Sequence, residues 1–243
     1  MKNRLFKSSI LLSLLFLVDW FASNKPLIDF YQNGKISIHD LLFSMINDSS
    51  GYQSSLEYTL IYIIPFLLYL SYVGGRTTIV EVTRLKQRKN YVQKKLLHII
   101  ISAAFFAGIH EIIAAVGMVY VFPFRMLVEY SYFGGMLVQT GVLSLFYIQT
   151  GLLYEICSCL VFGKMALLAA FLVYLIQFYT ALLSNKLWLP CDDVTVLYAL
   201  FIKELSLPDV MLILVRGYLM GIVLYQFYRY VFERKDLLQY ETK

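Results

Sequence analysis

Six long apolar stretches constrain this chain more than any other feature of its sequence. They cover roughly residues 5–22, 58–73, 96–122, 135–162, 165–183 and 210–232. A helix needs about 20 mostly apolar residues to cross the hydrocarbon of a bilayer. Backbone groups cannot go unpaired in lipid, and the runs are continuous rather than alternating as in a transmembrane barrel. The sequence therefore predicts an all-α, polytopic membrane protein with six spans, forming a single transmembrane domain over residues 1–243.

Composition supports the membrane class and excludes three others. Hydrophobic residues make up 59% of the chain and charged residues 15%, against about 25% charged residues in soluble domains. A soluble protein of this size has too little interior to bury so much apolar surface. A soluble globular enzyme, a disordered chain and a disulfide scaffold are therefore excluded. We expect residues 5–22 to remain as an anchor, because Asp19-Trp20-Phe21 stands where a signal-peptide cleavage site needs small residues.

The distribution of Lys and Arg predicts the orientation of the six spans. Placing both termini inside leaves about three times as many basic residues in the inner segments as in the outer ones. Two outer segments are then long, at 23–57 and 184–209. Within the first, residues 36–46 suit a short amphipathic helix, and a solvated connector is an equally weighted alternative.

The inner segment between the second and third spans is strongly basic. Ile79, Val82 and Leu85 recur at helical spacing, while the basic side chains point elsewhere. This pattern predicts an amphipathic helix on the cytoplasmic surface over 76–95. The alternative is a positive-inside determinant that binds anionic lipid. The candidate docking residues are Arg76, Ile79, Val82, Arg84, Leu85, Arg88 and Lys89.

Ionisable residues within the spans are costly and are therefore candidate site residues. His110 and Glu111 lie on small-residue faces of the third span, so we expect both to face the bundle interior. Counting residues along the helices predicts that Arg216 pairs with Glu111, and Asp19 is the alternative partner. Such a pair either locks helices together or serves function.

The fourth span carries a polar stripe along one helical face. Its members are Thr140, Ser144, Tyr147, Gly151, Glu155 and Ser158. A stripe of this length lines either a partner helix or a wet cavity. Glu155 lies on the inner side, too far from Arg216 to pair with it.

Several catalytic and metal-binding patterns are missing. Ala114 stands where a zincin helix that began at His110-Glu111 would need its second His. His39, His98 and His110 lie at three different depths, so their spacing predicts no metal site. The chain has no phosphate-binding loop, so we expect no ATP hydrolysis, catalysis, metal or cofactor in this chain, and no nucleic-acid partner.

The layout resembles the permease subunits of type-2 ATP-binding-cassette (ABC) transporters. The shared features are the six spans with both ends inside, the basic inner helix and a broken hydrophobic segment between the last two spans. The resemblance implies that residues 76–95 couple to a separate ATPase subunit, which binds ATP and Mg²⁺. It also implies a second permease copy or a related permease, a location in the bacterial cytoplasmic membrane, and short membrane-dipping helices near 194–205.

A shorter motif is similar to that of a bacterial membrane protein family named for Trp-x-Pro-x-x-Asp. Here it reads Trp188-Leu-Pro190-Cys-Asp-Asp193, directly before the last span. From the residues themselves, we expect Trp188 to anchor at the interface, Pro190 to fix a turn, and Asp193 to cap a helix that starts at Val194. The alternative is that the acidic pair meets a cationic peptide.

The expected function is export of a peptide or another amphipathic cargo, with bacteriocins as the cargo that the resemblance suggests. The alternative is a membrane protein without transport activity, such as a bacteriocin immunity factor or an assembly factor.

Overall fold

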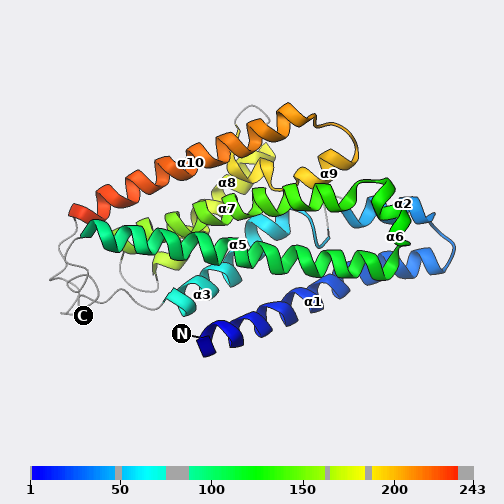
Figure 1. Ribbon diagram of the computed structural model, residues 1–243, viewed down its shortest axis with the longest axis horizontal. Helices are drawn as coiled ribbons and strands as arrows, with labels where there is room; N and C mark the ends of the chain where they lie inside the picture. The colour runs from blue at the N-terminus through cyan, green and yellow to red at the C-terminus, as the bar shows by residue number, and fades with distance from the viewer. Residues whose placement is uncertain (1, 47–50, 75–87, 162–164, 184–187, 235–243) are drawn as a thin grey trace.

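The computed structural model describes residues 2–46, 51–74, 88–161, 165–183 and 188–234. These residues form helices and turns, with no strand among them (Figure 1). The elements are α1 (Lys2–Gln32), α2 (Ile38–Ile46), the π-helical turn η1 (Glu57–Ile61), α3 (Ile63–Gly74), α5 (Arg88–Val121), α6 (Phe124–Glu129), α7 (Tyr132–Leu160), α8 (Met165–Leu183), the 3₁₀ turn η2 (Pro190–Asp193), α9 (Val196–Phe201) and α10 (Leu207–Arg234). Six helical segments are long and apolar enough to cross a membrane, with η1 and α3 together forming the second. The all-α class is confirmed for the described residues, which contain six helical segments long and apolar enough to be the predicted spans.

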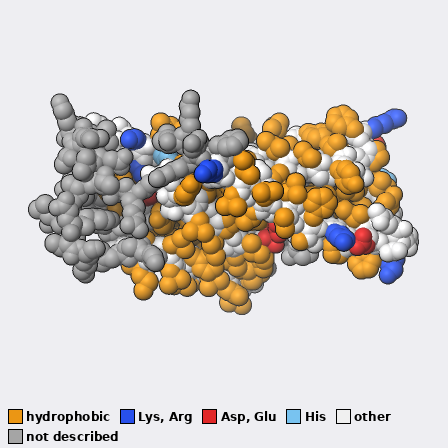
Figure 2. Space-filling model, turned by 90° about the horizontal axis from the view of Figure 1, so that it is seen from below, with side chains coloured by type: hydrophobic (Ala, Val, Ile, Leu, Met, Phe, Trp, Pro, Cys, Tyr) orange, Lys and Arg blue, Asp and Glu red, His pale blue; other side chains and the backbone are white. Residues whose placement is uncertain are grey.

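The long helices lie side by side, with α7 packed against α5, α8 and α10, and α1 packed against α5 (Figure 1). The end of α10 and the start of α5 lie at one end of the bundle, which we call the terminal end, and α1 begins on the same side but farther inward. The short helices α2, α6 and α9 gather at the opposite, far end. Hydrophobic side chains cover the middle of the face in Figure 2, and Lys and Arg lie mainly toward its ends. This distribution suits a bundle that is surrounded by lipid at its waist.

The first helix is longer than predicted, because α1 continues through Pro26 to Gln32. Residues 23–32 therefore extend the helix beyond the apolar stretch instead of forming an outer loop. The helix ends at Gln32, and Gly34 just beyond it adopts a φ of 68° and donates its N–H to Tyr31 O at 2.9 Å. Glycine adopts this left-handed conformation without the strain that a side chain would add.

The amphipathic helix predicted over 36–46 is confirmed as α2, which buries Leu41, Leu42 and Met45. Ser37 and Asp40 form a capping box at its start. The Asp40 N–H donates to Ser37 Oγ at 3.1 Å, and the Ser37 N–H donates to Asp40 Oδ2 at 3.2 Å. The Ser37 hydroxyl also donates to Asp40 Oδ2 at 2.7 Å. This bond and the one from the Ser37 N–H favour the ionised carboxylate and lower the pKa of Asp40.

The predicted docking helix falls mostly outside the described residues. Arg76, Ile79, Val82, Arg84 and Leu85 all lie within 75–87, for which no structure is described. Arg88 opens α5, and Lys89 is exposed on its first turn.

Candidate functional site

The site begins with two neighbouring residues of α5, His110 and Glu111, which are each 1% exposed. Ala103, Ala107 and Ala114 are buried on the same side of the helix and allow close packing there. The sequence predicts that Phe105, Ile109, Ile112 and Val116 face lipid. Phe105, Ile112 and Val116 are exposed, whereas Ile109 is partly buried against the core. The expected inward orientation of His110 and Glu111 is therefore confirmed.

The Glu111 carboxylate is held by three neutral or weakly basic partners. His110 Nδ1 lies 3.1 Å from Oε1, and the Tyr58 hydroxyl donates to Oε1 at 3.3 Å. The Gln53 amide donates to Oε2 at 3.4 Å. No Arg or Lys of the described residues forms an ion pair with Glu111, in a region where an unpaired charge is costly.

Aromatic rings enclose the His110 imidazole. Tyr52 stacks on it, with ring centroids 4.2 Å apart and planes 6° apart. Phe16, Tyr58 and Tyr62 approach it at steep angles, with centroids 5.0 to 5.1 Å away. We call this set of residues, together with Gln53, Glu111 and Asp19, the His110–Glu111 cluster.

The cluster joins three separate parts of the chain. The Tyr62 hydroxyl donates to Asp19 on α1, and the Tyr52 hydroxyl donates to His110 O at 3.1 Å. Sequence reasoning placed Tyr52 and Gln53 in a polar outer segment and missed both of them. The sequence indicates a shared site for Tyr58 and Tyr62 only weakly, because their four-residue spacing puts both hydroxyls on one helix face.

Arg216 pairs with Asp193, so the predicted Arg216–Glu111 pair is wrong, as is the alternative with Asp19. Arg216 Nε donates to Asp193 Oδ2 at 2.8 Å, and Nη2 donates to the other carboxylate oxygen. The Trp188 indole N–H donates to Asp193 Oδ2 at 3.0 Å, and the guanidinium lies 4.9 Å from the Trp188 ring centroid. The outer segment folds back along α10, which residue counting along the helices cannot detect.

The predicted capping role of Asp193 is also wrong. Helix α9 begins at Val196, and the residue before it, Thr195 rather than Asp193, stands at the N-cap position without a side-chain capping bond. Pro190 does fix a turn, because it opens η2, where Asp192 Oδ2 accepts the Leu189 N–H at 2.7 Å. Burial raises the pKa of Asp193, and the Arg216 guanidinium limits that rise.

Two glutamines of α7 also hold neighbouring segments, and sequence reasoning missed both. Gln139 accepts the Leu197 N–H at 2.9 Å and donates to Val194 O. Gln149 donates to Gly217 O on α10 at 2.9 Å. These bonds hold α9 and α10 against α7.

The polar stripe of α7 faces partner helices. Tyr147, Gly151 and Glu155 are buried, and a Cβ added at Gly151 would lie 2.6 Å from Ile99 of α5. The other three stripe hydroxyls donate to carbonyls of their own helix: Thr140, Ser144 and Ser158. These contacts favour the partner-helix interpretation of the stripe.

Near the terminal end, Glu155 forms an ion pair with Lys95 of α5 at 3.1 Å. Tyr91 of α5 stacks on Phe232 of α10, with ring centroids 5.2 Å apart and planes 12° apart. The first turns of α5 are therefore fixed to both α7 and α10.

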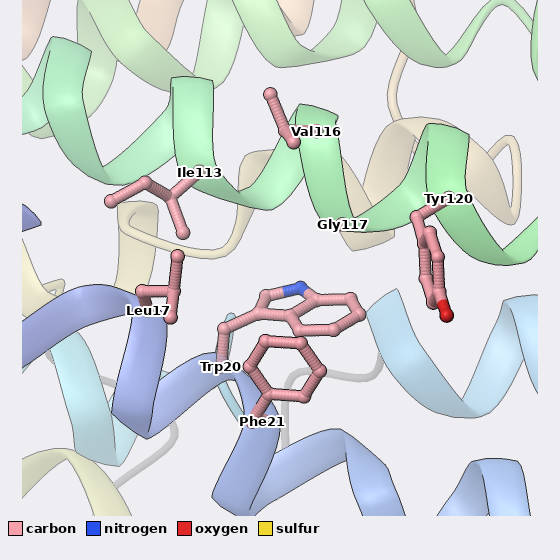
Figure 3. A pocket seen from close by; sticks show the side chains of 7 residues that line it. All are labelled: Leu17, Trp20, Phe21, Ile113, Val116, Gly117 and Tyr120. Carbon is pink, nitrogen blue, oxygen red and sulfur yellow. The ribbon is translucent and has the colours of Figure 1, made fainter. Parts of the chain in front are cut away.

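An apolar cavity of about 270 Å³ lies between α1 and α5 (Figure 3). Its lining residues are Leu17, Trp20, Phe21, Ile113, Val116, Gly117 and Tyr120. The Trp20 indole lies against Gly117, where an added Cβ would be 2.2 Å from the ring. Val116 and Tyr120 are exposed on the outer surface, so the cavity borders the lipid-facing side.

Among the described residues, no group of three or more His, Cys, Asp or Glu side chains is placed to hold a metal ion. No family model, curated protein or solved structure matches this chain. The fold and the site thus define the class only as a helical protein of membrane-spanning type, with six segments of spanning length among its described residues.

Proposed function

We propose that this chain is the permease subunit of an ABC transporter in the bacterial cytoplasmic membrane, exporting a peptide or another amphipathic cargo. A separate subunit supplies ATP hydrolysis, and a second permease completes the complex. Six helices of spanning length support this proposal. Helix α1 starts and α10 ends toward the same side of the bundle. This also supports the proposal, since an even number of spans returns the chain to the side where it began.

The observation that carries the proposal is the continuity of α5. This helix has 34 residues and is uninterrupted from Arg88 to Val121, which corresponds to about 50 Å at 1.5 Å per residue. It begins next to the basic segment 75–87, and His110 follows about 33 Å along it. A displacement at the terminal end is therefore transmitted directly to the His110–Glu111 cluster.

Contacts of the first turns of α5 spread such a displacement to other helices. The Lys95–Glu155 pair reaches α7, and the Tyr91–Phe232 stack reaches α10. His98 lies against the end of α3, because a Cβ added at Gly74 would be 3.0 Å from its ring. An ATPase docked on residues 75–87 would thus act on four helices at once.

Affinity purification from the native host in mild detergent tests the docking role. We expect the wild-type chain to retain an ABC ATPase, identified by mass spectrometry. The triple variant Ile79→Asp, Val82→Asp, Leu85→Asp should lose it, because three carboxylates disrupt the apolar stripe.

A matched variant carries the same added charge on the other side of the predicted helix: Thr77→Asp, Val80→Asp and Gln87→Asp. We expect this variant to retain the ATPase. Recovery of the wild-type chain without any ATPase, or equal loss in both variants, would count against the permease proposal. Retention of a cationic peptide without an ATPase would instead favour an immunity factor.

A further inference from the structure

A buried nitrogen without a partner lies at the centre of the His110–Glu111 cluster. His110 Nδ1 lies 3.1 Å from Glu111 Oε1, whereas Nε2 has no hydrogen-bond partner among the described residues. A neutral imidazole that donates its Nδ1 proton to a carboxylate keeps a lone pair on Nε2. The His110 side chain therefore presents a buried base inside its aromatic enclosure.

The surroundings of this nitrogen are acidic. Glu111 bonds the imidazole, and Asp19 bonds Tyr62, whose ring lies beside the imidazole. Within the described part of the chain, Lys and Arg side chains form ion pairs with Glu155, Asp193 and Glu233, none of which belongs to the cluster. The negative charge of the cluster is therefore not balanced by a Lys or Arg contact.

The Tyr52 hydroxyl lies near the same acidic side chains. Burial raises the pKa of this hydroxyl well above its usual range, and the charges of Glu111 and Asp19 add to the rise. A field that opposes a second negative charge at Tyr52 favours a positive charge beside it.

The aromatic enclosure suits a positive charge as well. A cation within about 6 Å of a ring centroid is attracted by the face of the ring. The Tyr52 ring lies nearly parallel to the imidazole, with ring centroids 4.2 Å apart, and therefore presents its face to it. The site is filled by the side chains of the enclosure, and a proton needs no cavity in order to bind.

We propose that the His110–Glu111 pair is a proton-binding site. One proton adds to Nε2 and forms an N–H bond, and the Glu111 carboxylate balances the resulting imidazolium. The titratable groups that face the pair from the neighbouring elements are Asp19, Tyr52, Glu57, Tyr58, Tyr62, Tyr132 and Tyr147.

Proton binding also acts on the segment that covers the pair. Tyr52 and Gln53 hold residues 51–56 to His110 O and Glu111 Oε2. A positive charge on the imidazole attracts the Glu111 carboxylate and so changes the hydrogen bond that Gln53 donates to it. Proton binding therefore regulates how firmly residues 51–56 are held. The site stands on contacts within this chain and does not rest on the permease proposal.

Nitrogen NMR of the full chain in lipid nanodiscs tests the proposal. The chain has three histidines, so His39→Gln with His98→Gln leaves His110 as the only imidazole. We expect its ¹⁵N signals to change from the neutral to the doubly protonated pattern as pH falls, while circular dichroism shows an intact fold. An unchanged pattern over the whole pH range of the folded protein would overturn the proposal.

The Glu111→Gln variant in the same background removes the balancing charge. We expect the midpoint of the His110 transition to move about one pH unit or more toward lower pH, whereas the exposed control Glu233→Gln leaves it in place. An unmoved midpoint in Glu111→Gln would contradict the site. If that variant does not fold, Asp19→Asn replaces it. We expect a smaller shift of the midpoint in the same direction, and an unmoved midpoint in Asp19→Asn would contradict the site. The NMR measurement requires no ATPase, so a failure of this proposal can be distinguished from a failure of the docking proposal.

Discussion

At the scale of single residues, the charged side chains within the bundle have partners that their depth along a helix does not reveal. Burial of His110 and Glu111 follows from the small residues on their helix faces, and the sequence predicts it correctly. The partner of Arg216 does not follow, because Asp193 belongs to an outer segment whose path depends on η2, Gln139 and the Trp188 ring. Tertiary contacts of this kind leave no periodic signal in a sequence.

Replacement of Arg216 by Lys should weaken the attachment of the outer segment. A Lys ammonium can neither bond both Asp193 oxygens in parallel nor stack on Trp188 as the guanidinium does. Because the Arg216 side chain is about one-third exposed, we expect a loss of only about 1 kcal/mol in the free energy of unfolding.

Chemical denaturation in detergent micelles measures this loss, with Arg229→Lys as the control. Arg229 pairs with Glu233 four residues along on the exposed surface, where solvent screens such a pair and it contributes little to stability. Equal effects of the two substitutions would show that the bidentate, stacked geometry of Arg216 contributes nothing.

Gly117 should tolerate no side chain. A Cβ there would lie 2.2 Å from Trp20, so Gly117→Ala forces the indole or α1 to move. We expect a destabilisation of about 1–3 kcal/mol, as is usual for overpacking, together with a shift of Trp fluorescence.

The matched variant is Gly108→Ala on the same helix, where an added Cβ meets nothing within 4 Å. Since alanine favours helix more than glycine does, this change should be neutral or stabilising. A Gly117→Ala protein as stable as Gly108→Ala would contradict the packing of α1 against α5.

At the scale of elements, continuous hydrophobicity predicts the spans well but predicts their ends poorly. Helix α1 continues ten residues past the apolar stretch, because no strong helix stop precedes Gly34 and Pro26 alone does not end it. The short helix α2 is predictable from its pattern of apolar residues. The fold-back of residues 51–56 onto α5 is not, because Tyr52 and Gln53 read as ordinary loop residues.

The capping box of α2 makes the stability of this helix depend on pH. The lowered pKa of Asp40 means that the native state favours the carboxylate. Its contribution is therefore complete above the unfolded-state pKa of about 3.9 and disappears as pH falls through the lower native value. Ser37→Ala should remove most of this dependence and cost about 1 kcal/mol of helix stability.

Hydrogen exchange of the α2 amides measures both effects. Ser54→Ala is a suitable control, because Ser54 Oγ accepts the Glu57 N–H outside α2. Faster exchange in α2 of the Ser54 variant, or no change in the Ser37 variant, would contradict the capping role of Ser37.

At the scale of the whole molecule, three polar contacts divide the bundle by depth. The Lys95–Glu155 pair lies near the terminal end, the His110–Glu111 cluster lies farther along α5, and the Asp193–Arg216 pair holds the outer segment. The sequence predicts this division only in outline, through the positions of the charged residues along the spans. The proposed transport mechanism requires that the basic segment 75–87 and the α2 end of the bundle face opposite sides of the membrane.

Labelling with a membrane-impermeant thiol reagent tests this requirement most directly. On a background with Cys157, Cys159 and Cys191 replaced by Ser, one variant carries Thr78→Cys and another carries Lys35→Cys. In intact cells we predict that the thiol at position 35 reacts, and that the thiol at position 78 reacts only in inside-out membrane vesicles. Reaction of both thiols from the same side, or of position 78 in intact cells, would contradict the proposed orientation and with it the docking of a cytoplasmic ATPase.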